Sequence, residues 1–226
     1  TMRNKIINGA MVIDQRNATA TINANSRTYC VDRFAGQGQN TDGVFTLVKD
    51  TLAPAGFVAS LKATVTTADS SLTTNQRYFI TQVIEGANIA DLAWGSVSAL
   101  PVTLSFWVRS SVTGTFGGVV KNLIGSATQS FPFSYTISSA NTWEQKTIQI
   151  TGSTTGTWNT DNSEGMTIAW TLGASSDLLN TANSWASGNY WAATGSTNLM
   201  ATNGATFYIT GVQLEAGSTA TAFEYR

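Results

Sequence analysis

Trp107 and Arg109 are the residues whose type and spacing most directly suggest a binding function. They lie two positions apart in the segment 102–109, so in an extended chain both side chains point to the same face. An indole ring offers a flat apolar surface on which a sugar ring can stack, and a guanidinium donates hydrogen bonds to hydroxyl groups. Gln82, in the expected strand 78–85, is a further candidate for neutral hydrogen bonds. The alternative for Trp107 is a ring covered by a loop or by a neighbouring subunit.

A second group of aromatic residues falls in a stretch rich in Gly, Ser and Asn. Trp185, Tyr190 and Trp191 lie within the eight residues 184–191. Recognition loops often combine rigid, amphipathic rings with small, adaptable hydrogen-bonding residues. This composition makes the three residues candidates for carbohydrate binding, while a loop that folds back onto the body of the protein would explain them equally well.

The residues that most enzymes require are missing. The chain has no histidine and a single cysteine, Cys30, so a Ser–His–Asp triad, a Cys–His pair and a zinc site built from Cys and His are all excluded. Glycoside hydrolysis needs only two carboxyl groups and stays open as a third, less favoured function. No spacing selects a pair among its candidates, which are Glu85, Asp91, Glu144, Asp161, Glu164, Asp177 and Glu215. We therefore expect a protein that is not an enzyme.

We expect no cofactor, and a structural calcium ion is only weakly indicated. Calcium requires several oxygen ligands, and Glu215 follows the last expected strand while Asn8 lies near the first. No loop rich in Asp accompanies them.

The charge pattern favours an uncharged partner. Charged residues make up 11% of the chain, the net charge is −1, and the basic residues are scattered. Phosphate neutralisation requires a dense basic face, so we expect no nucleic-acid binding. The sequence also has no apolar run long enough to cross a bilayer, so we expect no membrane insertion.

The elements that position these residues are strands. Apolar and polar residues alternate with a period of two over 57–65, 102–109 and 166–172, which indicates strands with one buried face. Shorter strands are expected over 44–49, 78–85, 131–137, 144–150 and 207–214. In the last of these the alternation slips, and a bulge at Thr210–Gly211 would restore it.

Roughly nine strands separated by turn-rich stretches predict an all-β, antiparallel β-sandwich with very little helix. We expect one domain over residues 1–226, in which residues 1–20 form either an N-terminal arm or the first strand.

Several segments resemble, in the same order, a module common in tail-fibre and appendage proteins of tailed bacteriophages. They are 3–18, Tyr29-Cys30-Val31-Asp32-Arg33-Phe34, Ile84-Glu85-Gly86, 101–110, 141–146, 207–215 and 223–226. Two departures from that pattern are Phe34, where Trp is usual, and Ala222, where Pro is common.

The resemblance implies a jelly roll like that of carbohydrate-binding modules. It also implies display on the virion, extracellular action, homotrimer formation, other fibre proteins as partners, and attachment to a host-surface glycan. The alternative is a structural or trimerisation domain without a ligand of its own. If there is a host-specific site, residues 175–197, which are least like the pattern, are where we expect it.

Overall fold

Two antiparallel sheets form the protein, and the computed structural model describes residues 3–15, 19–123 and 128–226. The six-stranded sheet has the order β1 (Thr19–Ile22), β4 (Val44–Asp50), β5 (Ser60–Thr67), β15 (Thr206–Ala216), β7 (Val102–Ser110), β10 (Glu144–Ile150). The seven-stranded sheet has the order β13 (Ala186–Ser187), β9 (Gln129–Ile137), β8 (Gly114–Lys121), β11 (Glu164–Ala174), β6 (Arg77–Glu85), β3 (Phe34–Gln39), β2 (Arg27–Tyr29). These pairings confirm the predicted antiparallel sandwich.

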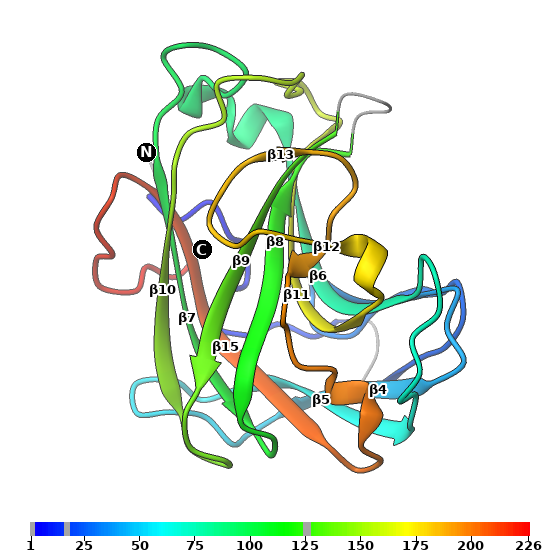
Figure 1. The fold of residues 1–226 in the computed structure, drawn as a ribbon. Helices are drawn as coiled ribbons and strands as arrows, with labels where there is room; N and C mark the ends of the chain where they lie inside the picture. Colours follow the sequence, from blue (N-terminus) through cyan, green and yellow to red (C-terminus); the bar gives the residue numbers. More distant parts are fainter. Residues whose placement is uncertain (1–2, 16–18, 124–127) are drawn as a thin grey trace.

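The chain crosses repeatedly between the two sheets, which is the pattern of a jelly roll (Figure 1). It passes from β5 to β6, returns in β7, crosses again to β8 and β9, and continues through β10 and β11 to β15. A parallel pair of two-residue strands, β12 (Leu179–Asn180) and β14 (Ala192–Ala193), lies outside the two sheets. Helical structure in the described residues is limited to 3₁₀ turns, which are η1 (Gly86–Asn88), η2 (Ala90–Leu92), η4 (Ser176–Leu178) and η5 (Leu199–Ala201).

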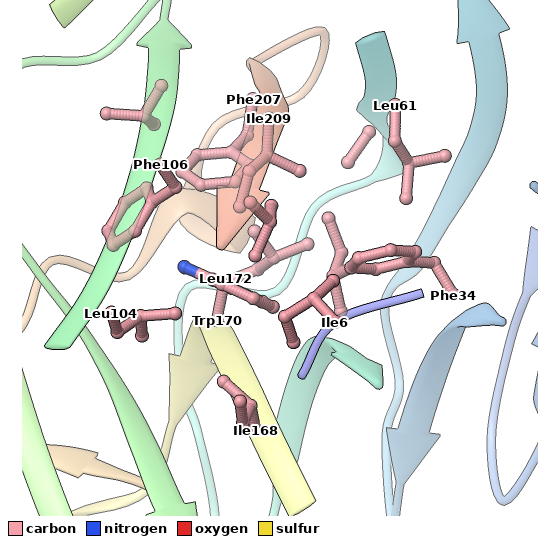
Figure 2. Packing of buried hydrophobic residues seen from close by; sticks show 14 of the residues in the cluster. Ile6, Phe34, Leu61, Leu104, Phe106, Ile168, Trp170, Leu172, Phe207 and Ile209 are labelled. Carbon is pink, nitrogen blue, oxygen red and sulfur yellow. The ribbon is translucent and has the colours of Figure 1, made fainter. Parts of the chain in front are cut away.

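The core lies between the sheets and follows the predicted alternation. The inward set of β11, from Met166 to Leu172, is fully buried, and Trp170 is its largest member. The Trp170 ring lies 6.3 Å from that of Phe34 and 5.7 Å from that of Phe106, so it joins both sheets. Figure 2 shows this ring among the side chains around it. Full burial of such a side chain contributes about 3 kcal/mol.

The predicted bulge in the last strand is confirmed. The pairing of β15 with β7 shifts between Thr210 and Gln213, and Gly211 has a φ of 60°. A Cβ atom at Gly211 would lie 2.7 Å from the Phe57 ring and 3.0 Å from Trp107 Cδ1, so the position requires glycine. Phe57 itself is not in a strand. The sequence predicted a strand from residue 57, but its amide closes a turn onto Pro54 O at 3.1 Å, and β5 begins at Ser60.

The N-terminal arm, residues 3–15, contains neither helix nor strand, and the first strand begins at Thr19. The arm lies along β15 and the C-terminal segment: Lys5 N donates to Leu214 O at 2.8 Å, and Val212 N donates to Gly9 O at 3.0 Å. In Figure 1 the two ends of the chain accordingly lie close together. Residues 1–2 and 16–18 of the expected arm lie outside the described residues, and the single domain over 1–226 stays a prediction.

Candidate functional site

A pocket of about 500 Å³ opens where the N-terminal arm meets the edge of the seven-stranded sheet. Its lining residues are Ile7, Asn8 and Ile13 of the arm, Tyr29 of β2, Asp32 and Arg33 of the following turn, and Val83 and Glu85 of β6. Apolar walls with a few converging polar groups, at this volume, are typical of sites for small molecules.

The strongest polar feature of the pocket is the pair formed by Arg33 and Glu85. Arg33 Nη2 lies 2.6 Å from Glu85 Oε1 and also donates to Val83 O at 3.2 Å. Asn88 Nδ2 donates to the other carboxylate oxygen of Glu85 at 3.2 Å. Burial alone would raise the pKa of Glu85, but the hydrogen bond and charge of Arg33, with other hydrogen bonds, hold that pKa below its ordinary value. Glu85 is therefore a fixed anion near neutral pH.

Arg33 has a φ of 73°, in the left-handed region that a side chain with a Cβ atom rarely adopts. The conformation arises in the tight connection between β2 and β3, where Phe34 N donates to Val31 O and Cys30 N donates to Phe34 O. Backbone of this kind costs about 1–3 kcal/mol and is concentrated at functional sites. Met11 in the neighbouring arm has a φ of 59° and adds to this local strain.

The rim of the pocket is apolar and open to solvent. Tyr29 is 37% exposed and Ile13 is 45% exposed. The Arg27 guanidinium lies 5.7 Å from the centre of the Tyr29 ring. Tyr29 therefore presents part of a flat ring at the mouth of the pocket.

Asn8 and Asp32 fix the wall that the arm contributes. Asn8 Nδ2 donates to Ile13 O and to Asp32 O, both at 2.9 Å, and Asp32 Oδ1 accepts from Gln15 N at 2.9 Å. Because these bonds hold the arm against the turn that carries Arg33, the pocket is largely preformed.

Gln82 is buried, which corrects its prediction as a residue that contacts a ligand. It is 1% exposed, and its side chain accepts from Ile7 N and donates to Ile7 O, both at 2.9 Å. Its parity in β6 places it on the inner face of the sheet. Gln82 therefore holds the arm in place beneath the pocket.

Trp191 is also buried, at 4% exposure, so the expectation that its ring faces a ligand does not hold for this conformation. Its ring packs on Phe79 at 4.2 Å, with the Arg77 guanidinium at 4.8 Å and Lys121 Nζ at 4.4 Å. Tyr190 is half-buried, and its amide donates to Ser130 Oγ at 3.3 Å.

Trp185 packs into an aromatic cluster at the edge of the core. Its ring lies 5.4 Å from that of Trp94 and 5.7 Å from that of Trp158, and its Nε1 donates to Thr151 O at 2.8 Å. The alternative considered for this stretch, a loop folded back onto the sandwich, describes the observed arrangement.

Trp107 and Arg109 share the outer face of the six-stranded sheet, as their spacing predicted, and both are half-buried. Arg109 Nε donates to Asn141 O at 2.9 Å, and its guanidinium lies 5.0 Å from the centre of the Tyr208 ring. Neither residue lines the pocket, which belongs to the other sheet. They form a separate surface.

Glu215 is buried and satisfied by hydrogen-bond donors. Its Oε1 accepts from Gln213 Nε2 and from Thr221 N, both at 2.8 Å, and its Oε2 accepts from Thr221 Oγ1 at 2.7 Å. In the part of the chain that the structure describes, no group of three acidic, Cys or His side chains could hold a metal ion. Glu215 thus anchors the C-terminal segment, and the weak calcium expectation stays a prediction.

The pocket residues were missed as a group because they come from distant parts of the sequence. Tyr29, Asp32 and Arg33 lie about fifty positions before Glu85, and the pairing of β3 with β6 brings the segments together. The available signal was that both segments carry the resemblance to the phage module.

Comparison with known proteins gives a match in fold only. No protein-family model matches the sequence, and no curated protein matches it. A protein from Bacteroides thetaiotaomicron, to which sugar binding is provisionally ascribed, matches with a TM-score of 0.54 and 13% identity over 95% of this chain and 100% of that one. A family 11 carbohydrate-binding module of a Clostridium thermocellum cellulase matches with a TM-score of 0.44 and 11% identity. That match covers 88% of this chain and 100% of the module.

The enzymatically active domain of tailspike protein 4 from bacteriophage CBA120 matches with a TM-score of 0.45 and 14% identity. The match covers 94% of this chain and 21% of that one, so the chain spans about a fifth of the length of that enzymatically active domain. Separately, no helix in the described part of the chain is long and apolar enough to cross a membrane.

Proposed function

We propose that this protein is a carbohydrate-binding module whose site is the pocket beside the Arg33–Glu85 pair. The observation that carries the proposal is the convergence, in one preformed pocket, of a part-exposed tyrosine ring with fixed donors and acceptors. A ring face accepts the apolar side of a sugar, and the charged pair offers hydrogen-bonding groups to its hydroxyls. The fold shared with the Bacteroides protein supports this assignment.

A neutral sugar fits the pocket better than an acidic one. The lining carries one guanidinium, on Arg33, and two carboxyl groups, on Asp32 and Glu85. Because Arg33 is already paired with Glu85, an added carboxylate or sulfate would face the remaining negative charge of Asp32. A volume of about 500 Å³ suits one or two sugar rings better than a long chain segment.

Binding without cleavage is the better description of this pocket. A glycosidase requires a carboxylic acid whose pKa is raised so that it can protonate the leaving oxygen. The pKa of Glu85 is instead held below its ordinary value by Arg33. Incubation with polysaccharides, followed by a reducing-end assay, tests this point: fragments that disappear in Glu85→Gln and Asp32→Asn variants would establish cleavage.

A glycan array containing both neutral and acidic glycans, followed by calorimetry on the best neutral hit, tests the site. We expect Tyr29→Ala and Arg33→Ala each to weaken binding at least about tenfold, which corresponds to about 1.4 kcal/mol. Trp107→Ala is the matched control, because it removes a part-exposed ring from the other sheet, and we expect it to bind as the wild type does. The reverse result, in which only Trp107→Ala loses binding, would move the site to the outer face of the six-stranded sheet.

We also propose that the module acts on a virion fibre as a trimer and recognises host-surface glycan. The support is the resemblance of seven segments to phage appendage modules. Light scattering on the purified chain tests for trimer formation, and binding to intact bacterial cells tests for host attachment. A trimer that binds neither cells nor any glycan on the array would favour the purely structural function.

A further inference from the structure

Lys121, at the end of β8, is a fully buried amine without a carboxylate partner among the described residues. Its side chain has 0% exposure, and the ion pairs of the described chain do not include it. Its oxygen contacts are with one short segment: Nζ lies 2.5 Å from Asn189 Oδ1 and 3.3 Å from Tyr190 O. A desolvated amine of this kind is a good nucleophile, because water and counter-charge do not hold it in the ammonium form.

The carboxamide of Asn189 is polarised from a second side. Trp191 Nε1 donates to the same Oδ1 at 3.0 Å, so two N–H donors converge on one carbonyl oxygen. When Lys121 acts as the nucleophile, the Trp191 N–H remains to stabilise the negative charge that develops on this oxygen. Asn189 is an exposed residue, so a small leaving group released there has a short path to solvent.

We propose that Lys121 and Asn189 form an intramolecular amide cross-link with release of ammonia. Lys121 Nζ, as the neutral amine, adds to Asn189 Cγ while the developing oxyanion is held by Trp191 Nε1. A new bond forms between Nζ and Cγ, and the bond between Cγ and Nδ2 breaks. One proton of Nζ is transferred to Nδ2, which leaves as ammonia. The reaction changes no oxidation state and requires no other reactant.

The electrostatics of the surrounding residues favour the reactive form of the amine. Burial lowers the pKa of Lys121 to about 7, and the nearby Arg77 guanidinium of β6 acts in the same direction, against an opposing effect of Glu164 in β11. Near neutral pH a large fraction of the amine is therefore unprotonated, whereas an exposed lysine is almost entirely charged. The Arg77 guanidinium and Lys121 Nζ lie 4.8 Å and 4.4 Å from the centre of the same Trp191 ring.

The cross-link would fasten the segment that covers the outer face of the seven-stranded sheet. Trp191 and Leu178 pack there on Phe79 and Val119. The two linked residues are 68 positions apart, so the bond would close a long loop in the unfolded chain. Restriction of a long loop stabilises the folded state mainly by lowering the entropy of the unfolded one. This inference does not depend on the proposed glycan site.

Intact-mass spectrometry of the purified full chain tests the proposal. We expect a mass lower than that of the sequence by one ammonia, together with a branched tryptic peptide that joins Lys121 to Asn189 and no cleavage after Lys121. The variants Lys121→Arg and Asn189→Ala should show the full mass, and Lys62→Arg, the matched control at an unrelated lysine, should keep the deficit. A wild-type chain that retains its full mass after prolonged incubation at mildly alkaline pH overturns the proposal.

The peptide map separates this reaction from succinimide formation at an asparagine, which also releases ammonia. A succinimide leaves tryptic cleavage after Lys121 intact and persists in Lys121→Arg. That result would equally overturn the cross-link. If either variant fails to fold, the tryptic peptide map of the wild-type chain alone distinguishes the cross-link from a succinimide.

Discussion

Arg33 reaches Glu85 across 2.6 Å from a backbone position whose φ is 73°. The ion pair itself contributes little stability, because its two side chains are 35% and 34% exposed and such pairs are worth about 0–1 kcal/mol. The strained backbone costs at least as much, about 1–3 kcal/mol. Stability therefore does not explain why an arginine occupies this position, whereas presentation of its guanidinium to the pocket does.

Substitution of Arg33 by glycine and by alanine separates the strain from the side chain. Both variants lose the guanidinium, so both should lose glycan affinity. Only Arg33→Gly relieves the left-handed backbone, and we expect it to be more stable than Arg33→Ala by about 1 kcal/mol. Urea unfolding measures this difference. Equal stabilities, or a more stable alanine variant, would show that the position is not strained.

The charge on Glu85 should make binding at the proposed glycan site sensitive to acid. Because the pKa of Glu85 is lowered in the folded protein, the contribution of its charge to folding stability is complete above the ordinary value of 4.5 and is lost as the pH falls through the lower folded value. The carboxylate that pairs with Arg33 in the pocket is protonated as the pH falls through that same folded value. We expect glycan affinity to be constant near neutral pH and to decrease as the pH falls below 4.5. Titration calorimetry across this range, with circular dichroism to verify folding, measures the effect.

Glu85→Gln is the control for this pH dependence. The variant should bind more weakly at neutral pH, and its residual binding should not change over the acidic range. If the variant shows the same acid loss as the wild type, another group titrates and Glu85 is not responsible.

The fold was predictable because the periodicity of buried strands is a local property of the sequence. Alternation located the inward face of β7 and β11, and the slip in parity located the bulge at Gly211. The start of β5 was predicted too early, at residue 57, because Phe57 is apolar and has the parity of the inward residues. In the structure the Phe57 ring instead packs on that of Phe223, with 5.0 Å between the ring centres. Parity cannot distinguish a strand residue from a turn residue that packs outside the core.

The site was less predictable because exposure of an aromatic ring depends on tertiary contacts. Trp191 is in a polar, turn-rich stretch, so the sequence left ligand contact and packing against the sandwich equally open, and the structure buries the ring against Phe79 and two cations. The pocket instead depends on the pairing of β3 with β6 and on the course of the N-terminal arm. No spacing within a single segment encodes either relationship.

A buried hydroxyl group should contribute measurably to stability at the other end of the seven-stranded sheet. The Tyr78 hydroxyl donates to Asp69 Oδ2 at 2.5 Å and accepts from Gly43 N at 2.7 Å. Tyr78→Phe leaves a buried backbone donor without its acceptor, and we expect a loss of about 1–3 kcal/mol in the free energy of unfolding. Urea denaturation measures it. Tyr225→Phe is the matched control, because Tyr225 is 60% exposed, and a similar loss there would contradict this explanation.

The close approach of the arm to β15 at Gly9 should determine the position of the pocket wall, although Gly9 itself does not line the pocket. A Cβ atom at Gly9 would lie 2.0 Å from Val212 O, so Gly9→Ala must displace the arm. Because Ile7, Asn8 and Ile13 of the arm line the pocket, we expect faster hydrogen exchange in residues 3–15 and a loss of glycan affinity.

The matched control for Gly9→Ala is Gly204→Ala. Gly204 has a φ of 78° with open space around it, so alanine there costs about 1 kcal/mol of stability without any contact with the arm. If both variants bind glycan equally well, the arm does not shape the site. If only Gly9→Ala loses binding while most of its stability is retained, the wall of the pocket is set by the packing of the arm on β15.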